Sequence, residues 1–301
     1  MEITHKGWPA LPLAAWADTY ATLHMWTQIV GKIRLALAPP VNHWWHVTLH
    51  VTPRGLTTRA MPYDGGCCEI LFDFVEHRLR IETSGGESRS LPLAPQSVAD
   101  FYAHTLTLLG ELGINVRIWP MPVEVVSPVR FDRDHANKSY DAVAVERWWH
   151  VMLQVNAALE TFRGEFIGKS SPVHFFWGSF DLAVTRFSGR PAPPREGADA
   201  MTREAYSHEV ISVGFWPGAV GASEAAFYAY AAPEPPGFDA AHVEPPPAFY
   251  SKDFKEFLLK YEDMRTAASP CDALLAFART TYAAGASLGG WSAELERRER
   301  T

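Results

Sequence analysis

Two stretches of the chain together carry histidine, serine and carboxylate side chains among aromatic residues, which is the mixture that general acid–base chemistry uses. The first is PVNHWWHVTLHVTPR, from Pro40 to Arg54, and the second is SPVHFFWGSFDLAVTRFSGR, from Ser171 to Arg190. Alternation with period two predicts that each stretch is one strand with an apolar face and a mixed face. The mixed faces hold Trp44, His46, Thr48, His50 and Thr52 in the first stretch, and Phe175, Trp177, Ser179, Asp181, Ala183 and Thr185 in the second.

If the two strands lie near one another, imidazole, hydroxyl and carboxylate groups meet in an aromatic setting. We expect a pocket there for a small, partly apolar or aromatic molecule, which the protein binds and which it transforms if the site is catalytic. The candidate catalytic residues are His46 and His50 for proton transfer, Asp181 to orient one of them, and Ser179. The candidate binding residues are Trp44, Trp177, His43, His174, His24, Gln28, His208, Glu209 and Arg186.

Several of these residues also have a purely structural interpretation. His43 and His174 stand at the start of their stretches, where an imidazole bonded to a backbone carbonyl would anchor a turn, and this interpretation is favoured over a catalytic one. His24, Gln28 and Lys32 are spaced by four, which is typical of the exposed flank of a helix. Residues 208 and 209 are adjacent on a predicted strand, so only one of them can face the pocket.

The aromatic face has an alternative use as an interface, because Trp, Tyr and Phe are enriched where proteins meet. The alternative function is therefore a homodimer or a protein–protein interaction module without catalysis. An interface would be flat, whereas a ligand site would be concave and enclosed.

Composition excludes other classes of function. The formal net charge of −7 disfavours a nucleic-acid binder. The N-terminal residues lack an apolar signal segment and no run reaches transmembrane length, so we expect no membrane partner and a cytoplasmic location. The three cysteines, two of them vicinal at Cys67 and Cys68, do not form a disulfide framework.

No cofactor and no metal are predicted. His46 and His50 are four residues apart, roughly 13 Å along a strand, which is too far for one metal ion. Residues 164–170 resemble a phosphate-binding loop but have three residues between the glycines instead of four. Neither a dinucleotide-binding glycine fingerprint nor a nucleophile elbow occurs.

The elements that would position these residues repeat along the chain. Each candidate strand follows a predicted helix that ends in Gly-Lys, at Gly31-Lys32 and at Gly168-Lys169. The other expected elements are helices over 13–29, 97–113, 140–167, 254–261 and 270–286, and strands over 55–60, 69–74, 78–83, 116–119, 207–215 and 227–231. The predicted fold is α+β, with two pseudo-symmetric repeats of helix, antiparallel sheet and helix packed as one unit, over residues 1–130 and 131–301.

The motifs resemble those of a bacterial family of uncharacterised proteins, known as a domain of unknown function. They are TYATLHMWTQIVGK at 19–32, PVNHWW at 40–45, VRIWPMP at 116–122, the stretch 172–190 and YSHE at 206–209. The resemblance spans nearly the whole chain. It implies membership of the family and assigns no activity.

Overall fold

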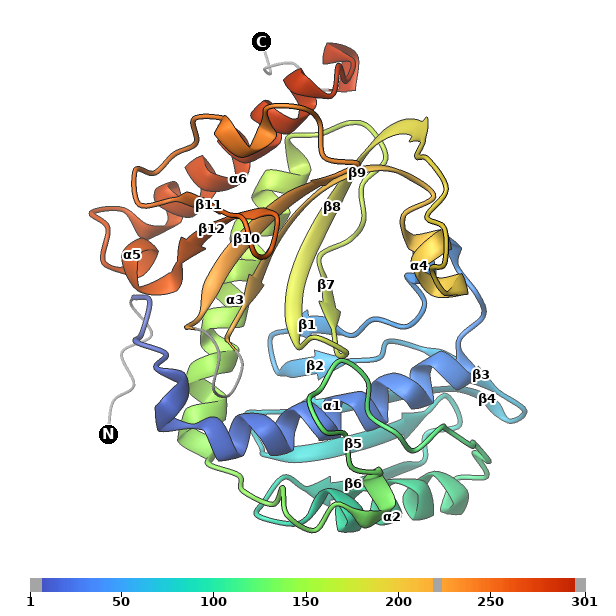
Figure 1. Cartoon of the computed structure of the whole chain (residues 1–301). Helices are drawn as coiled ribbons and strands as arrows, with labels where there is room; N and C mark the ends of the chain where they lie inside the picture. The colour runs from blue at the N-terminus through green and yellow to red at the C-terminus, as the bar shows by residue number, and fades with distance from the viewer. Residues whose placement is uncertain (1–6, 219–223, 296–301) are drawn as a thin grey trace.

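Two antiparallel sheets stand one above the other in the computed structural model, which describes residues 7–218 and 224–295 (Figure 1). The fold is α+β, as predicted. Each half of the chain contributes a long helix, a six-stranded sheet and a closing helix, although the expected twofold relation between the halves and the boundary near residue 130 stay predictions.

The first sheet follows helix α1 (Ala17–Leu37) and the short 3-10 turns η1 (Leu13–Ala15) and η2 (Asn42–Trp44). Its strand order is β1-β2-β4-β5-β6, with β3 paired to β4. The strands are β1 (His50–Thr52), β2 (Gly55–Thr57), β3 (Met61–Tyr63), β4 (Gly66–Asp73), β5 (Arg78–Thr83) and β6 (Ser88–Pro92). Helix α2 (Val98–Glu111) closes this half, and the Ser97 hydroxyl caps it by accepting a hydrogen bond from the Asp100 amide.

The second sheet follows helix α3 (Ala142–Gly164) and has the strand order β11-β12-β10-β9-β8-β7. Its strands are β7 (His174–Phe176), β8 (Asp181–Pro191), β9 (His208–Trp216), β10 (Ala226–Ala232), β11 (Phe249–Ser251) and β12 (Glu256–Lys260). The remaining elements are α4 (Ala200–Ala205), α5 (Tyr261–Arg265), α6 (Pro270–Leu288), η3 (Phe131–Arg133), η4 (Phe238–Ala240) and η5 (Ala293–Leu295).

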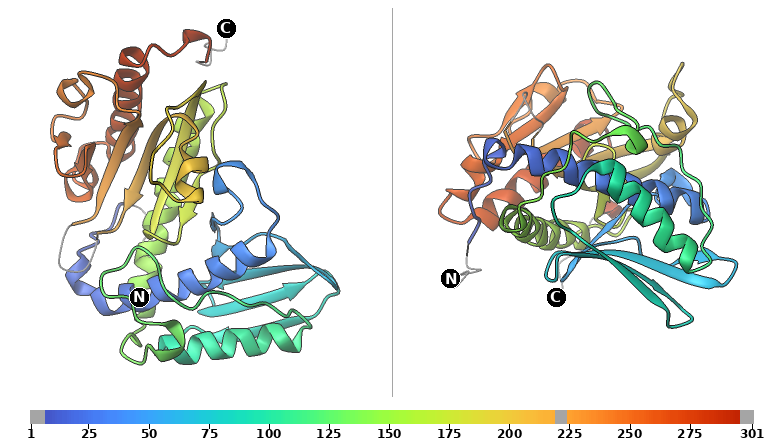
Figure 2. Two further views of the ribbon diagram at one scale, coloured as in Figure 1. Left: turned by 45° about the vertical axis from the view of Figure 1, so that its right-hand side comes forward. Right: turned by 90° about the horizontal axis from the view of Figure 1, so that it is seen from below.

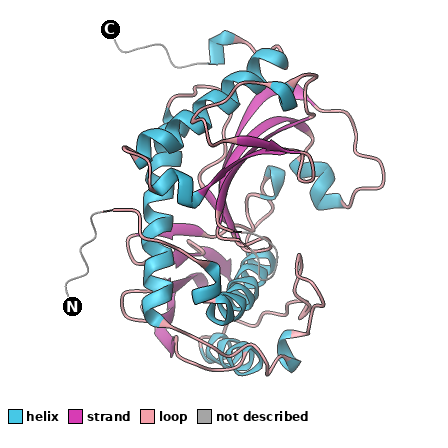
Figure 3. Cartoon of the chain, turned by 60° about the vertical axis from the view of Figure 1, so that its left-hand side comes forward, coloured by secondary structure: helices cyan, strands magenta, loops and turns pink. Residues whose placement is uncertain are grey.

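The helices α3 and α6 cover only one face of the second sheet, as the two views of Figure 2 and the colouring of Figure 3 make visible. Val184 on β8, Val213 on β9 and Phe227 on β10 are fully buried on that face. The opposite face of the sheet is concave and turns toward α4 and the segment around residue 44 (Figure 1).

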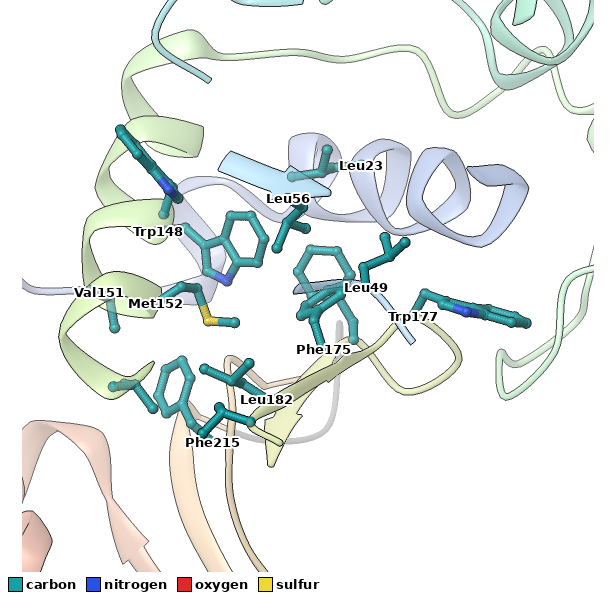
Figure 4. Close-up of a cluster of buried hydrophobic side chains, with 14 of the residues drawn as sticks. Leu23, Leu49, Leu56, Trp148, Val151, Met152, Phe175, Trp177, Leu182 and Phe215 are labelled. Atoms are coloured by element: carbon teal, nitrogen blue, oxygen red, sulfur yellow. The ribbon is translucent and has the colours of Figure 1, made fainter. Parts of the chain in front are cut away.

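A β-bridge joins the two sheets. Leu49 and Phe175 exchange backbone hydrogen bonds of 3.0 and 2.9 Å, and both side chains are fully buried. Trp148 from α3 packs edge-on against Phe175, with ring centroids 5.9 Å apart. Figure 4 shows Leu49, Leu56 and Phe175 in this shared cluster, with Trp177 at its edge.

The predicted helix stop at Gly31 is wrong, because α1 continues to Leu37. Glycine is present for close packing: a Cβ at residue 31 would come within 2.3 Å of the Trp177 ring. The Trp177 indole then donates a 2.6 Å hydrogen bond to the Val47 carbonyl. Glycine inside a helix lowers stability relative to alanine. Here the missing side chain lets the Trp177 ring approach the helix backbone.

Both candidate strands are shorter than predicted. Residues 40–48 form the η2 turn and irregular chain, with positive φ at His43 (58°) and Trp44 (60°). The stretch 171–190 is a hairpin, because Phe180, at φ 62°, turns the chain between β7 and β8. Residues 116–119 form no strand, and 254–261 contains β12 and the start of α5 instead of one helix.

Candidate functional site

A cavity of about 840 Å³ occupies the concave face of the second sheet. This volume is within the range that small-molecule sites have. Side chains of alternate residues form its floor, as the period of a strand requires. They are Asp181, Ala183, Thr185 and Phe187 on β8, Val210, Ser212 and Trp216 on β9, Ala226, Tyr228 and Tyr230 on β10, and Glu256, Leu258 and Lys260 on β12.

The walls of the cavity come from segments on both sides of residue 130. They are His43 to Trp45 of η2 and its C-cap, Val47, the loop residues Val123 and Glu124, the hairpin residues 176–179, Phe249, Phe254, Glu224 and four residues on and after α4. Most of this lining is aliphatic or aromatic. A molecule that binds there would therefore bury apolar surface against the lining.

Asp181 is the polar centre of the floor. Its side chain is only 6 % exposed, and two hydroxyl groups donate to it. The Ser179 hydroxyl bonds Oδ1 at 2.7 Å, and the Tyr228 hydroxyl bonds Oδ2. These two bonds hold the carboxylate in one orientation at the start of β8.

The bond from Tyr228 crosses the intervening strand β9. Gly214 of β9 pairs with Ala183 on one side and with Tyr228 on the other. A Cβ at residue 214 would lie 2.4 Å from the Tyr228 hydroxyl oxygen. The glycine therefore leaves the space over which the tyrosine ring reaches the carboxylate.

Burial dominates the electrostatics of this site. It raises the pKa of Asp181 to about 6, although the bonds from Tyr228 and Ser179 act in the opposite direction. Burial also raises the pKa of Glu256 to about 7, and the charge of Asp181 adds to that shift. The two carboxyl groups therefore change protonation state close to neutral pH.

A third carboxylate approaches from the loop after α2. Glu124 is exposed over much of its surface, but its Oε1 would be 2.5 Å from a Cβ at Gly178, so its end packs against the hairpin turn. This partial burial raises the pKa of Glu124, and the nearby Ser179 side chain acts in the opposite direction. Glu124 also has a positive φ of 56°, which is strained backbone for a residue other than glycine.

The charges that line the cavity are unbalanced. Lys260, the one lysine or arginine among the described lining residues, forms a 3.1 Å ion pair with Glu224. No ion pair in the described part of the chain involves Asp181, Glu124 or Glu256. The cavity thus offers three carboxylates without a basic partner.

Five of the sequence-predicted residues line this cavity: Asp181, Ser179, Trp44, Trp177 and His43. His43 also bonds backbone carbonyls, because its Nδ1 lies 3.1 Å from the Glu204 oxygen. That contact ties η2 to α4, in agreement with the structural interpretation of this histidine.

His46 and His50 do not reach the cavity, so the expected contact between a histidine and Asp181 is wrong. The reason is that residues 40–48 form no strand, and the alternation used to place these side chains does not hold there. His46 accepts a 3.1 Å hydrogen bond from the Val41 amide within its own turn. His50 lies on β1 beside His174, with ring centroids 5.2 Å apart.

The exposed flank expected for His24, Gln28 and Lys32 is also wrong, because all three are buried. His24 Nε2 lies 2.8 Å from the Gly178 carbonyl oxygen. Gln28 exchanges two 2.8 Å hydrogen bonds with the backbone of Val123. These side chains therefore hold the hairpin turn and the loop behind the cavity wall, and they do not line the cavity.

The last four candidates, His174, His208, Glu209 and Arg186, also lie outside the cavity lining. His208 contacts Ser207 at 3.0 Å, and Glu209 forms an ion pair with Arg190. Arg186 is on the helix-covered face of β8. Its guanidinium lies over the rings of Phe162 (3.5 Å), Tyr282 (4.2 Å) and Phe166 (5.0 Å).

Sequence reasoning missed Tyr228, Glu124 and Glu256 as site residues. The alternation of Tyr228 and Tyr230 in the predicted strand 227–231 was a usable signal, since it places two hydroxyl groups on one face. Glu256 was hidden by the prediction of a helix over 254–261. Nothing in the sequence indicated that Glu124, in a proline-rich loop, approaches the hairpin.

The described residues contain neither a group of potential metal ligands nor a membrane-spanning helix. No group of three or more His, Cys, Asp or Glu side chains in this part of the chain is placed to hold a metal ion. Among the described helices, none combines the length and the hydropathy needed to cross a bilayer.

Comparison with known proteins identifies a family but no individual relative. A model described as a family of unknown function, DUF5996, matches residues 8–297 and confirms the resemblance. No curated protein and no solved structure matches the chain.

Proposed function

The chain belongs to the DUF5996 family, whose function is unknown, and we propose from the pocket itself that the protein binds a small, largely apolar or aromatic molecule carrying a basic nitrogen. The observation that carries this proposal is the unbalanced charge of an aromatic cavity. Asp181, Glu124 and Glu256 face or border the same 840 Å³ space without a cationic partner.

The chemistry of the walls fits such a molecule. Trp44, Trp177 and Tyr230 present aromatic surface, which attracts both apolar rings and organic cations. A protonated amine that donates to Asp181 would replace water at a carboxylate that burial has partly neutralised. Binding would then lower the pKa of Asp181, because a nearby positive charge favours the ionised form.

The concave form of the site supports ligand binding over the alternative of a flat homodimer or partner interface. Native mass spectrometry separates the two readings. A retained ligand adds mass that is lost on denaturation, whereas a dimer without ligand appears at twice the chain mass.

The proposal is tested with pairs of compounds of similar shape, such as phenethylamine and ethylbenzene, or benzylamine and benzyl alcohol. Thermal unfolding is followed at pH 8, where the raised pKa values of Asp181 and Glu256 still leave both groups ionised. We expect the amine of each pair to raise the melting temperature more than its neutral analogue. Equal effects of amine and analogue across the set would contradict the proposal.

Two tyrosine variants, one in the cavity and one outside it, test whether the amines bind in the cavity. Tyr228→Phe removes a donor to Asp181 and should change the affinity for the amines. Tyr250 lies on β11 outside the cavity lining, and its hydroxyl bonds Glu234, so Tyr250→Phe should bind as the wild type does.

Proton transfer by Asp181 is a second candidate function, favoured by its pKa of about 6, which suits an acid–base group near neutral pH. Bound amines would be incubated in D2O and analysed by mass spectrometry. Deuterium entering a C–H position in the wild type but not in Asp181→Asn would support catalysis. No incorporation would leave the protein as a binder.

A further inference from the structure

A second polar cluster lies at the junction of the two sheets and is separate from the cavity. His50 of β1 and His174 of β7 are 5 % and 2 % exposed, and their ring centroids are 5.2 Å apart. Arg34, near the end of α1, is 8 % exposed and donates to the carbonyl of Thr58. Thr58 follows Thr57, which pairs with His50 across β1 and β2.

Three nitrogens of this cluster are buried without a hydrogen-bond partner: Nδ1 of His50, Nδ1 of His174 and Nε of Arg34. A buried donor without an acceptor costs on the order of 1–3 kcal/mol. Unpartnered buried groups are rare in folded proteins. The two imidazoles are in ring contact, and the charge of Arg34 acts on both of them, so three such groups in one region point to a shared absent partner.

The cluster also lacks a compensating negative charge. No ion pair within the described residues joins Arg34 or Arg59 to a carboxylate. Glu69 of β4 is engaged by the hydroxyl of Thr57. Burial lowers the pKa of His50 to about 2, and its basic neighbours add to that shift.

We propose that Arg34, His50 and His174, with Arg59 at the rim, bind an oxyanion such as a phosphate group. A tetrahedral or planar oxyanion has several acceptor oxygens, so one group can accept from both imidazoles and from the guanidinium. The three orphaned nitrogens then gain partners, and the charge of Arg34 is neutralised. This inference does not depend on the function proposed for the cavity.

Thermal unfolding with inorganic phosphate or sulfate, against sodium chloride at matched ionic strength, tests the proposal. We expect a saturable rise in melting temperature with phosphate that chloride does not produce. Arg59 is exposed, so Arg59→Gln should fold normally and weaken the phosphate effect at least several-fold. Arg89→Gln, on the far edge strand β6, is the matched control and should respond as the wild type does.

Histidine NMR spectra locate the anion independently of stability. Phosphate should shift the ring resonances of His50 and His174 and raise their pKa values, which burial now depresses to about 2 and 3. The proposal is overturned if phosphate and chloride act alike on the wild type, or if Arg59→Gln responds fully. Shifts confined to other histidines would also overturn it.

Discussion

Gly214 lies against the ring of Tyr228, so closely that a methyl group on the glycine would come within 2.4 Å of the tyrosine hydroxyl oxygen. This contact connects three strands, because Tyr228 on β10 passes over Gly214 on β9 to donate to Asp181 on β8. The floor of the cavity therefore depends on the absence of a side chain in its central strand.

Gly214→Ala should displace Tyr228 and break its bond to Asp181. We expect an overpacking cost of about 1–3 kcal/mol in the free energy of unfolding, measured by urea titration, together with weaker amine binding. Gly110→Ala on the exposed side of α2 is the control, because no atom lies within 4 Å of its added Cβ. That variant should gain up to about 1 kcal/mol. Equal stability of the two variants would contradict the account of Gly214.

Asp181 should make the protein less stable as the pH rises. Its pKa is raised from 3.8 to about 6 in the folded state, so between these values the folded protein holds a proton that the unfolded chain has lost. At 1.36 kcal/mol per pKa unit, the full titration removes about 3 kcal/mol, of which about 2 kcal/mol is lost between pH 4 and pH 6. Urea unfolding of wild type and Asp181→Asn at both pH values measures the difference. An identical pH dependence in the two proteins would exclude a raised pKa at this position.

His24 should have the opposite effect on the pH dependence of stability, so that the protein becomes less stable as the pH falls. Burial lowers its pKa from 6.5 to about 4, so the unfolded chain takes up a proton before the folded protein does. Stability is then lost as the pH falls from 6.5 to 4, by about 3 kcal/mol from this residue. His24→Asn should be less stable at pH 7, since the contact with Gly178 is altered, but should show a flatter loss toward pH 4. A slope as steep as that of the wild type would contradict the assignment.

Phe175→Ala should destabilise both halves together. The ring is fully buried at the bridge between the sheets, and truncations of this kind cost about 3–5 kcal/mol. Hydrogen exchange should show faster global opening in α2 of the first half and in α6 of the second. Phe254→Ala, at a side chain that is 58 % exposed, is the control and should change neither. Faster exchange in one half alone would show that the halves open independently.

The sequence was informative where a strand or helix follows one period without interruption. The mixed face of β8 was predicted correctly for Asp181, Ala183 and Thr185, because alternation holds within that strand. The α+β fold class followed from the same reasoning over the longer helices and hairpins.

The predicted strand and helix boundaries failed where a single residue interrupts the hydrophobic periodicity. Phe180 takes a positive φ and converts one predicted strand into a hairpin. The residues Gly178 and Ser179 before it are typical of turns, but the period-two pattern continues across them and conceals the break. Gly31 resembles a helix stop in the sequence and is a packing contact for Trp177. The approach of Glu124 to Gly178 depends on tertiary contacts between distant segments, which single-sequence periodicity does not contain.

The most direct test of the cavity as an amine-binding site is methyl NMR of the protein with aromatic amines. The methyl groups of Ala183, Val210 and Leu258 lie in the cavity floor, and that of Ala278 lies on α6 away from the lining. We expect shifts at the three floor methyls that saturate with amine, leave Ala278 unchanged and weaken strongly in Asp181→Asn. Asp73→Asn, which alters a buried carboxylate bonded to Arg54 and Arg80 in the other sheet, should bind normally. Shifts that avoid the floor, or that persist unchanged in Asp181→Asn, would show that the cavity does not bind amines through Asp181.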